Sequence, residues 1–421
     1  MKAICQLRKG GKATISCVFI LIATSWADAG NWPQFRGPDG TGVSTEKNIP
    51  VTWSSGDYKW DVAIDGVGHA APIIWGDAVF VTSAEDSGAI RHLVCLDAKS
   101  GQKRWTRSIG MNRSKKHEKS SWASSTPATD GELVYSAFAD KESYLVDAYN
   151  FDGELVWRRN LGPYESQHGL GVSLILFEDS LIVPNDQDGP SFITALDRKT
   201  GKTKWVSSGR SFREASYATP IVVREKGKPA QLICPSGAMG ITGLDPHTGN
   251  LKWQTEEFPL RTVASPVYGN GLVIASCGQG GRFGVKQIAV DPFQTDESGH
   301  AVVKWTREKL IPYVPTPIVL GEHLFEWSDQ GIITCVALKT GKDVWTHRMG
   351  GNYSGSPLCI DGKLYGVEEN GKVVVIEAGP TFKQLGTADL GDGFHSTPAV
   401  ANGRLFLRTF ERLKCLEAKR D

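Results

Sequence analysis

The segment ALDRKTGKTKW, residues 195–205, has the residues of a tight polar turn followed by the start of a strand. Close copies of its last nine letters occur as DAKSGQKRW at 97–105 and DPHTGNLKW at 245–253. A turn that recurs with Asp, Gly and Trp at the same offsets indicates a repeated structural unit. The period of that repeat therefore decides the fold.

The tryptophans that end these turns supply the period. They recur every 40 to 52 residues, at Trp60, Trp105, Trp157, Trp205, Trp253, Trp305 and Trp345. One further step reaches Leu385, in a degenerate copy of the turn. This spacing is typical of four-stranded propeller blades. Between tryptophans, most units contain a Ser/Thr-Pro pair and a hairpin with turn residues, such as YGNGLVI at 268–274.

The two ends of the repeat region each hold half a unit. YKWDVAI (58–64) has a tryptophan strand with no unit before it, and RLKCLEA (412–418) lacks its turn and tryptophan. Together they complete one blade. We therefore predict an all-β fold: an eight-bladed β-propeller of four-stranded antiparallel blades over residues 58–421, closed by pairing of its N- and C-terminal strands.

The repeated turn itself has a structural interpretation. The Asp caps the turn, the Gly allows a backbone conformation or a close approach that a Cβ would prevent, and the Trp lies on the outermost strand. A flat indole can then cover bare peptide of the neighbouring blade. We expect the seven tryptophans to form a structural girdle, and we assign them no chemistry.

The first residues predict export. A basic start leads into the apolar run ATISCVFILIATSWA (13–27) and the small-residue site Ala27-Asp28-Ala29, which indicates a secretory signal peptide over residues 1–29. The run is shorter than the roughly 20 residues that span a bilayer. A Pro/Gly-rich leader follows at 30–57. We expect a periplasmic or envelope protein with no transmembrane segment after signal cleavage.

Charge and cysteine content narrow the function further. The chain has a net charge of +1 and no basic patch, so we expect no nucleic-acid partner. Six of its cysteines lie beyond the signal peptide, an even number that would allow disulfides in an exported protein. However, Cys95, Cys335 and Cys415 occupy a repeat position that otherwise holds small apolar residues, which favours core packing for these three.

The turn pattern A-x-D-x-x-T-G-x-x-x-W resembles the tryptophan docking motif of the quinoprotein-like, or PQQ-like, β-propeller family. Residues 195–205 fit it at every defined position, whereas Ala337 replaces the Asp in a later copy. The resemblance implies one of two functions. Quinoprotein dehydrogenases hold pyrroloquinoline quinone (PQQ) on the axis beside a calcium ion, an aspartate base and typically a disulfide between adjacent cysteines. BamB-like exported proteins of about this length are non-catalytic scaffolds.

The chain is more similar to the scaffolds, because it has no adjacent cysteines and no evident calcium cage. It lacks the lipidated cysteine expected of BamB itself. We predict a non-catalytic binding or assembly scaffold with no catalytic or metal-ligating residues and no cofactor. It would act as a monomer on a protein or peptide partner in the cell envelope. The alternative is a PQQ-dependent dehydrogenase, which would need PQQ with calcium.

Candidate binding residues come from one face of the predicted ring. In a propeller, the linkers into the inner strands and the loops between second and third strands share a face. The linkers and loops supply the candidates His69, Trp122, His168, Asp186, Asp188, Arg261, Tyr313, Tyr353 and His395. Aromatic anchors among polar groups suit an extended peptide or a polar ligand. The alternative is that the loops are simply polar and the aromatic residues plug the channel.

Two further segments are weaker candidates. NRSKKHEK (112–119) is basic and could touch an acidic partner, but we interpret it as a solvated charge run. GQGGRFG (278–284) is rich in glycine, but it follows a strand without opening a helix, which argues against a phosphate loop.

Overall fold

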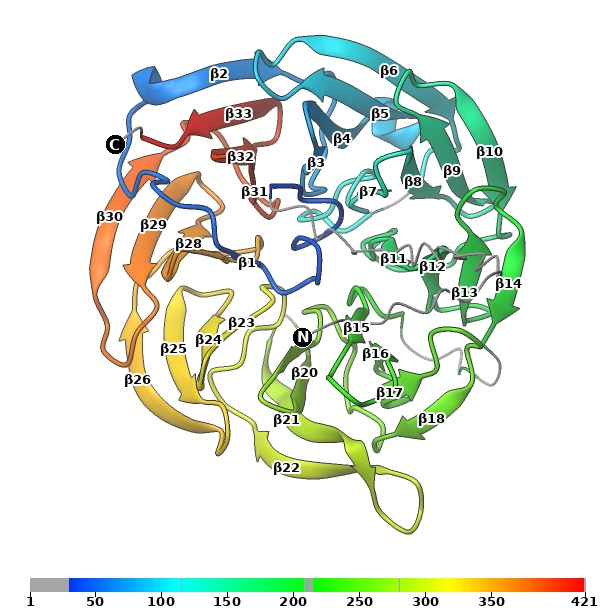
Figure 1. Ribbon diagram of the computed structural model, residues 1–421, viewed down its shortest axis with the longest axis vertical. Coiled ribbons are helices and arrows are strands. Elements are labelled where there is room, and N and C mark those ends of the chain that lie inside the picture. Colours follow the sequence, from blue (N-terminus) through cyan, green and yellow to red (C-terminus); the bar gives the residue numbers. More distant parts are fainter. Residues whose placement is uncertain (1–29, 115, 208–209, 211–214, 280, 420–421) are drawn as a thin grey trace, which may run out of the picture.

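The computed structural model describes residues 30–114, 116–207, 210, 215–279 and 281–419, so the predicted signal peptide lies outside the described residues. Eight sheets stand around a central axis like the blades of a propeller (Figure 1). In each blade the strands run antiparallel from the axis to the rim. The predicted all-β, eight-bladed fold is confirmed. In the described residues, no helix is long and apolar enough to cross a membrane.

The first four blades follow one another along the chain. Blade 1 holds β3 (Ile73–Trp75), β4 (Ala78–Glu85), β5 (Ile90–Asp97) and β6 (Lys103–Gly110). Blade 2 holds β7 (Ala128–Thr129), β8 (Leu133–Ala139), β9 (Tyr144–Asn150) and β10 (Leu155–Asn160). Blade 3 holds β11 (Ile175–Phe177), β12 (Ser180–Asn185), β13 (Phe192–Asp197) and β14 (Thr203–Val206). Blade 4 holds β15 (Ile221–Val223), β16 (Gln231–Ser236), β17 (Gly240–Leu244) and β18 (Leu251–Gln254).

Among the remaining four blades, blades 7 and 8 each include one strand from the start of the chain. Blade 5 holds β19 (Val267–Gly269), β20 (Leu272–Gln279), β21 (Gly281–Thr295) and β22 (Ala301–Arg307). Blade 6 holds β23 (Ile318–Leu320), β24 (His323–Trp327), β25 (Ile332–Ala337) and β26 (Lys342–Arg348). Blade 7 holds β27 (Leu358–Ile360), β28 (Lys363–Val367), β29 (Lys372–Glu377) and β30 (Gln384–Asp389), with β1 (Val43–Ser44) added to β27. Blade 8 holds β31 (Ala399–Ala401), β32 (Arg404–Arg408), β33 (Arg412–Glu417) and β2 (Tyr58–Ala63).

The ring closes in blade 8, as predicted. Strand β2 pairs antiparallel with β33, and Trp60 lies opposite Cys415. The side chains fasten the same junction, because Asp61 accepts hydrogen bonds from Arg412 Nε at 2.7 Å and Lys414 Nζ at 2.6 Å. The two ends of the propeller chain therefore share one sheet.

Tryptophans join neighbouring blades at the rim. The Trp205 indole lies over Gly249 of the next blade, where an added Cβ would sit 2.4 Å from the ring. Its Nε1 donates to the carbonyl of Pro246 at 3.1 Å. The same stacking recurs for Trp60 on Gly101, Trp105 on Gly153, Trp157 on Gly201 and Trp305 on Gly341. Trp253 differs: it donates to the side chain of Gln231, because the blade that follows has a long insertion in place of the glycine turn.

A second belt of contacts surrounds the axis. Just before the inner strand of blades 1 to 7, a backbone N–H donates to a hydroxyl of the next blade, over distances of 3.0 to 3.1 Å. The accepting hydroxyls, which we call the hydroxyl belt, belong to Thr126, Ser173, Thr219, Ser265, Thr316, Ser356 and Thr397. The belt stops at Ala71, the corresponding residue of blade 1, which has no hydroxyl. The recurring Ser/Thr of the sequence therefore links blade to blade.

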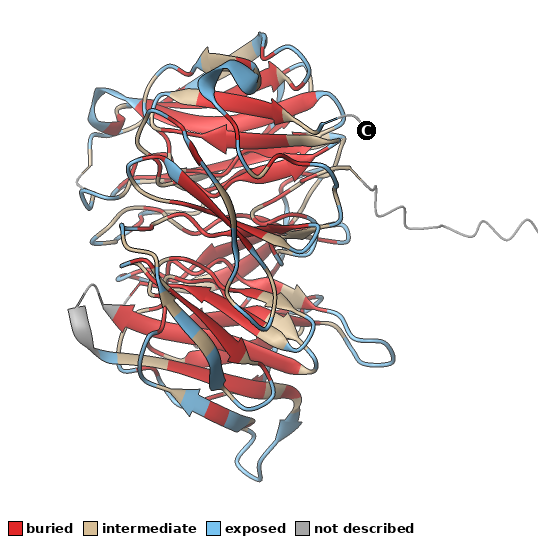
Figure 2. Cartoon of the chain, turned by 90° about the vertical axis from the view of Figure 1, so that its left-hand side faces the viewer, coloured by how far each residue is buried: buried red, intermediate tan, exposed pale blue. Residues whose placement is uncertain are grey.

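The core lies between the sheets, where buried residues fill the strands (Figure 2). The outermost strands are mostly exposed, and in β10 and β14 the tryptophan is the one buried residue. Cys95, Cys335 and Cys415 are fully buried, in line with the core packing expected for them. The six cysteines of the described chain are all unpaired thiols. Two short 3-10 turns, Ser55–Asp57 and Asp86–Gly88, complete the secondary structure.

Residues 30–57, the leader, cross the axis on one side of the ring before running outward to β2 (Figure 1). Arg36 is fully buried there and has no carboxylate partner among the described residues. Its guanidinium donates instead to the carbonyls of Pro317 at 2.7 Å, Thr41 at 2.9 Å and Pro357 at 3.2 Å. Because Pro317 and Pro357 precede the inner strands of blades 6 and 7, Arg36 ties the leader to both blades.

Candidate functional site

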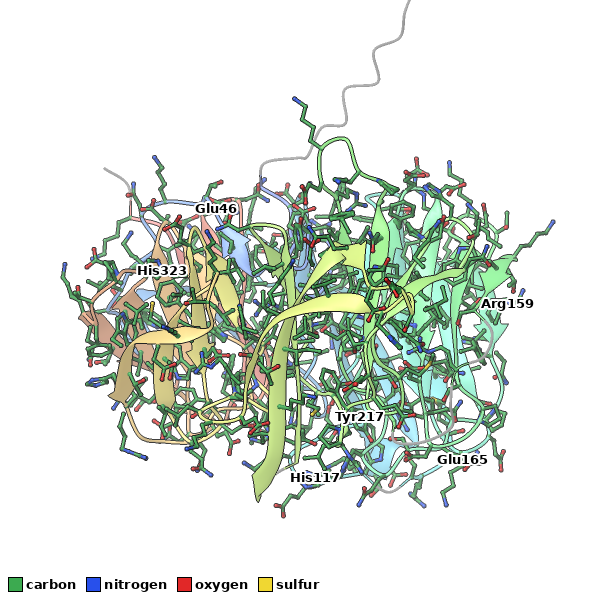
Figure 3. All side chains as sticks on the ribbon, turned by 90° about the horizontal axis from the view of Figure 1, so that it is seen from below. Glu46, His117, Arg159, Glu165, Tyr217 and His323 are labelled. Carbon is green, nitrogen blue, oxygen red and sulfur yellow. The ribbon has the colours of Figure 1, made fainter. Side chains whose placement is uncertain are left out.

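The two faces of the ring are different. We call the side crossed by the leader the leader face, and the side where the linkers enter the inner strands the mouth face. Figure 3 shows His117, Tyr217 and Glu165 toward the mouth face and Glu46, a leader residue, toward the opposite one. The candidate site lies on the mouth face.

A cavity of about 1440 Å³ opens on the mouth face and follows the axis. Phe35 of the leader lies at its inner end, and all seven residues of the hydroxyl belt line it. Each belt hydroxyl accepts one backbone hydrogen bond and keeps its own hydrogen for a further acceptor. The deep wall is therefore polar but uncharged.

Histidines and an aromatic ring gather at the mouth. The His69 and His395 rings lie 4.8 Å apart, and both contact Phe410, at 5.3 and 4.9 Å between ring centres. Burial lowers the pKa of His69 to about 3, with the nearby His395 adding to the effect. Burial also lowers the pKa of His395. Both rings are therefore neutral at pH 7, with one donor and one acceptor nitrogen each. His395 Nδ1 donates to the Lys119 carbonyl at 3.1 Å, which leaves its Nε2 as an acceptor.

The long linker between blades 1 and 2 reaches across the mouth. Lys119 Nζ contacts both carboxylate oxygens of Glu369, at 2.8 and 3.1 Å, although the two residues are 250 positions apart. Ser354 also donates to Glu369, at 2.6 Å. On the other side of the cavity, the His117 ring lies 5.0 Å from His168. The described part of NRSKKHEK, which we expected to be a solvated charge run, thus forms part of the mouth.

Arg261 is a cationic residue of the cavity wall. It lies near His168 and Tyr217, and its positive charge contributes, after burial, to the lowered pKa of His168. Arg261 makes no ion pair with a carboxylate among the described residues, which leaves its guanidinium available to an acceptor in the cavity. The Tyr217 hydroxyl is hydrogen-bonded to Ser166 Oγ at 2.8 Å.

Three carboxylates near the mouth are engaged by the protein itself. Asp329 accepts the backbone N–H groups of Tyr313 and Val314 at 2.8 and 3.1 Å, and burial raises its pKa. Asp188 accepts from the backbone of Ala215 at 2.8 Å. Glu369 is held by Lys119. These three groups shape the loops, and Glu118, Glu308 and Asp343 also line the cavity.

Three sequence candidates, Asp186, Tyr353 and Trp122, do not line the cavity. Asp186 is buried in an ion pair with Arg210, whose guanidinium contacts both of its oxygens. Tyr353 is 2% exposed and packs on Trp327, with ring centres 5.5 Å apart. Trp122 covers Gly88 and donates to the carbonyl of Ser114 at 2.7 Å. The remaining linker candidates, His69, His168, Arg261, Tyr313 and His395, line the cavity together.

The residues present do not fit the calcium ion that accompanies PQQ in the quinoprotein dehydrogenases. Within the described ranges, no group of three or more His, Cys, Asp or Glu side chains is placed to hold a metal ion. Calcium prefers several carboxylate and carbonyl oxygens at once. Asp188, Asp329 and Glu369 are tied to backbone N–H groups or to Lys119. The other acids of the cavity wall, Glu118, Glu308 and Asp343, do not form such a set in the described chain.

Eight four-stranded blades fastened by tryptophan–glycine stacking define a PQQ-like, or quinoprotein-like, β-propeller. The family described as outer membrane protein assembly factor BamB matches residues 90–347 and 329–419. The chain belongs to this family. None of the curated proteins matches it.

Solved structures show the same fold in both branches. BamB from Moraxella catarrhalis is similar with a TM-score of 0.60 and 15% identity, over 85% of this chain and 98% of that one. A europium-containing methanol dehydrogenase has a TM-score of 0.66 and 12% identity, over 92% and 98%. The quinohemoprotein alcohol dehydrogenase from Comamonas testosteroni has 0.64 and 13%, over 94% and 82%. At these identities the likeness shows the fold alone.

Proposed function

We propose that this protein is an exported, non-catalytic scaffold of the cell envelope that holds a protein or peptide partner on its mouth face. Membership of the BamB family supports a partner in the envelope. Residues 1–29 would direct export and be removed, and the propeller would act as a monomer. No cofactor takes part in this function.

One observation carries the proposal: the mouth gathers hydrogen-bonding and aromatic side chains, and the protein itself engages Asp329 and Glu369 there. Arg261, the neutral His69 and His395 and the hydroxyl belt all have hydrogen-bonding capacity toward the cavity. Tyr217 and Tyr313 add aromatic surface to the cavity wall. Tyrosines are enriched among the residues that dominate the binding energy of protein interfaces. This combination suits recognition of an extended polypeptide better than proton transfer.

Replacing Arg261, Tyr313 and His395 with Ala together should reduce partner capture by at least about tenfold, because interface energy concentrates in a few Arg and aromatic side chains. The mature protein would be used as bait in the envelope fraction of its own source, with quantification of every captured protein. The control carries Lys99→Ala, Lys202→Ala and Lys339→Ala, three exposed turn residues of the leader face. Equal capture by both variants, with equal melting temperatures, would contradict a recognition role for the mouth.

The dehydrogenase alternative rests on the quinoprotein neighbours and has its own test. The mature protein, incubated with PQQ and calcium and then desalted, should retain no quinone absorbance. It should also reduce no artificial electron acceptor when given alcohols or sugars, because a quinone needs a metal and a base as well as a flat site. Stoichiometric retention with substrate-dependent dye reduction would overturn the scaffold proposal and establish an enzyme.

A further inference from the structure

The middle residue of each inner strand points its backbone toward the axis. These residues lie three positions after the hydroxyl-belt position of each blade: Ile74, Thr129, Leu176, Val222, Tyr268, Val319, Cys359 and Val400. Ile74 faces Val79 across its hairpin, yet both its N–H and its C=O bond to the leader instead. Opposite residues of antiparallel strands alternate between bonding each other and pointing outward. The equivalent residues of the other blades are in the same register.

The leader satisfies the inward-pointing groups of blades 1, 2 and 3 in succession. Trp32 exchanges two backbone hydrogen bonds with Ile74, at 2.8 and 2.9 Å. The Pro33 carbonyl accepts from Thr129 N at 2.8 Å, and Gln34 Oε1 accepts from Leu176 N at 2.9 Å. Three consecutive leader residues thus serve three consecutive blades. A chain that crosses the inner strands can supply one acceptor to each blade.

The leader then leaves this path. Arg36 and Gly37 adopt positive φ angles of 62° and 86°, which turn the chain back over the axis. The leader next bonds an inner strand at blade 7, where Cys359 N donates to the Gly42 carbonyl at 2.8 Å and β1 adds to β27. In the described chain, the leader passes blades 4, 5 and 6 without a backbone hydrogen bond to the inner-strand residues Val222, Tyr268 and Val319.

A groove of about 260 Å³ lies over the bypassed blades. Val222, Tyr268 and Val319 line it, and leader residues 39–41 form one wall. Within the described chain, the N–H groups of these three residues receive no acceptor from the leader or from any side chain. The rest of the groove combines the apolar Ile221, Val223 and Val267 with the charged Arg224. Three backbone donors, one in each of three successive blades, therefore line this groove. The leader, which forms one of its walls, bonds the equivalent residues of blades 1, 2, 3 and 7.

We propose that this groove binds an extended peptide segment of a partner protein, whose acceptors bond Val222, Tyr268 and Val319 in turn. Leader residues 32–34 follow a path around the axis over blades 1 to 3, and the bound segment would continue this path over blades 4 to 6. Strand addition of this kind draws its affinity from main-chain hydrogen bonds and its selectivity from side-chain pockets. This site lies on the leader face and goes beyond the mouth-face function, so either can fail without the other.

Amide hydrogen exchange resolved to single residues tests the site. In the free protein, Val222, Tyr268 and Val319 should exchange at least about tenfold faster than Ile74 and Cys359, because exchange requires an open hydrogen bond. The probe is the acetylated and amidated tetrapeptide VPQV, which keeps the Pro-Gln of the leader between small apolar residues. At up to about 10 mM probe, in the weak range expected for so short a segment, exchange at the three groove amides should slow at least about threefold.

Matched controls separate groove binding from general effects. Thr41→Trp places a large ring in the groove from an exposed position and should abolish the slowing, whereas Thr45→Trp, on an exposed leader residue outside the groove, should preserve it. The all-D form of the probe should have no effect. Protection of the three amides in the free protein equal to that of Ile74, no slowing by the L-peptide, or equal slowing by the D-peptide would each overturn the proposal.

Discussion

Deletion of residues 30–64 is expected to leave a protein that does not fold into a stable ring. The deletion removes β2, so β33 loses its partner and exposes a full row of backbone donors and acceptors. It also removes Trp60, which is stacked on Gly101, and Arg36, which joins blades 6 and 7. Circular dichroism and size exclusion should therefore show loss of cooperative melting and association between molecules.

A permuted variant shows whether the strand itself is responsible. Residues 58–64 can be placed after Lys419 through a short loop, because β2 runs antiparallel to β33 and the two can form a hairpin. This permuted chain should recover a cooperative transition and monomeric elution. A deletion variant that melts at the wild-type temperature as a monomer would contradict closure by β2.

Trp205→Ala should lower the free energy of unfolding by about 3 to 5 kcal/mol, the range for truncating a large buried aromatic side chain. Trp205 is 8% exposed, stacks on Gly249 and loses its hydrogen bond to the Pro246 carbonyl in the variant. Urea unfolding at pH 7 measures the change. The whole propeller should be destabilised, because the indole joins blade 3 to blade 4.

Trp205→Phe is the matched control. It keeps an aromatic ring over Gly249 and removes the N–H donor. The loss of the hydrogen bond should therefore lower the free energy of unfolding by only about 1 kcal/mol. If Trp205→Ala leaves unfolding unchanged but weakens partner capture, Trp205 is a contact residue and not a structural one.

The number of blades could be predicted from the sequence because each repeat includes its own docking pair. Trp205 and Gly249 are 44 positions apart, yet each lies in a near copy of the same turn. The repeated turn sequence therefore indicates a contact between neighbouring blades. The closure of blade 8 followed from two incomplete units. The Ser/Thr before each inner strand was equally visible, but its role in the hydroxyl belt depends on a hydrogen bond to the preceding blade.

Side-chain availability at the mouth could not be predicted in the same way. Tyr353 and His395 occupy comparable linkers, but Trp327 of the preceding blade covers only the first. Asp186 is unavailable to a ligand because it is paired with Arg210, a residue that has no fixed place in the repeat. Lys119 reaches Glu369 across the mouth through a linker whose length is unique to one blade. Aperiodic segments are placed by tertiary contacts, which a repeat pattern does not record.

The pairing of β2 with β33 has a consequence for synthesis. A chain made from its N-terminus displays Tyr58–Ala63 long before Arg412–Glu417 exists, so the earliest strand waits for the latest. Contacts of such large sequence separation form slowly. Every chain that terminates early remains an open arc with a strand edge available to proteases and chaperones. The junction thus acts as a check on completeness, passed only when the last blade has been translated.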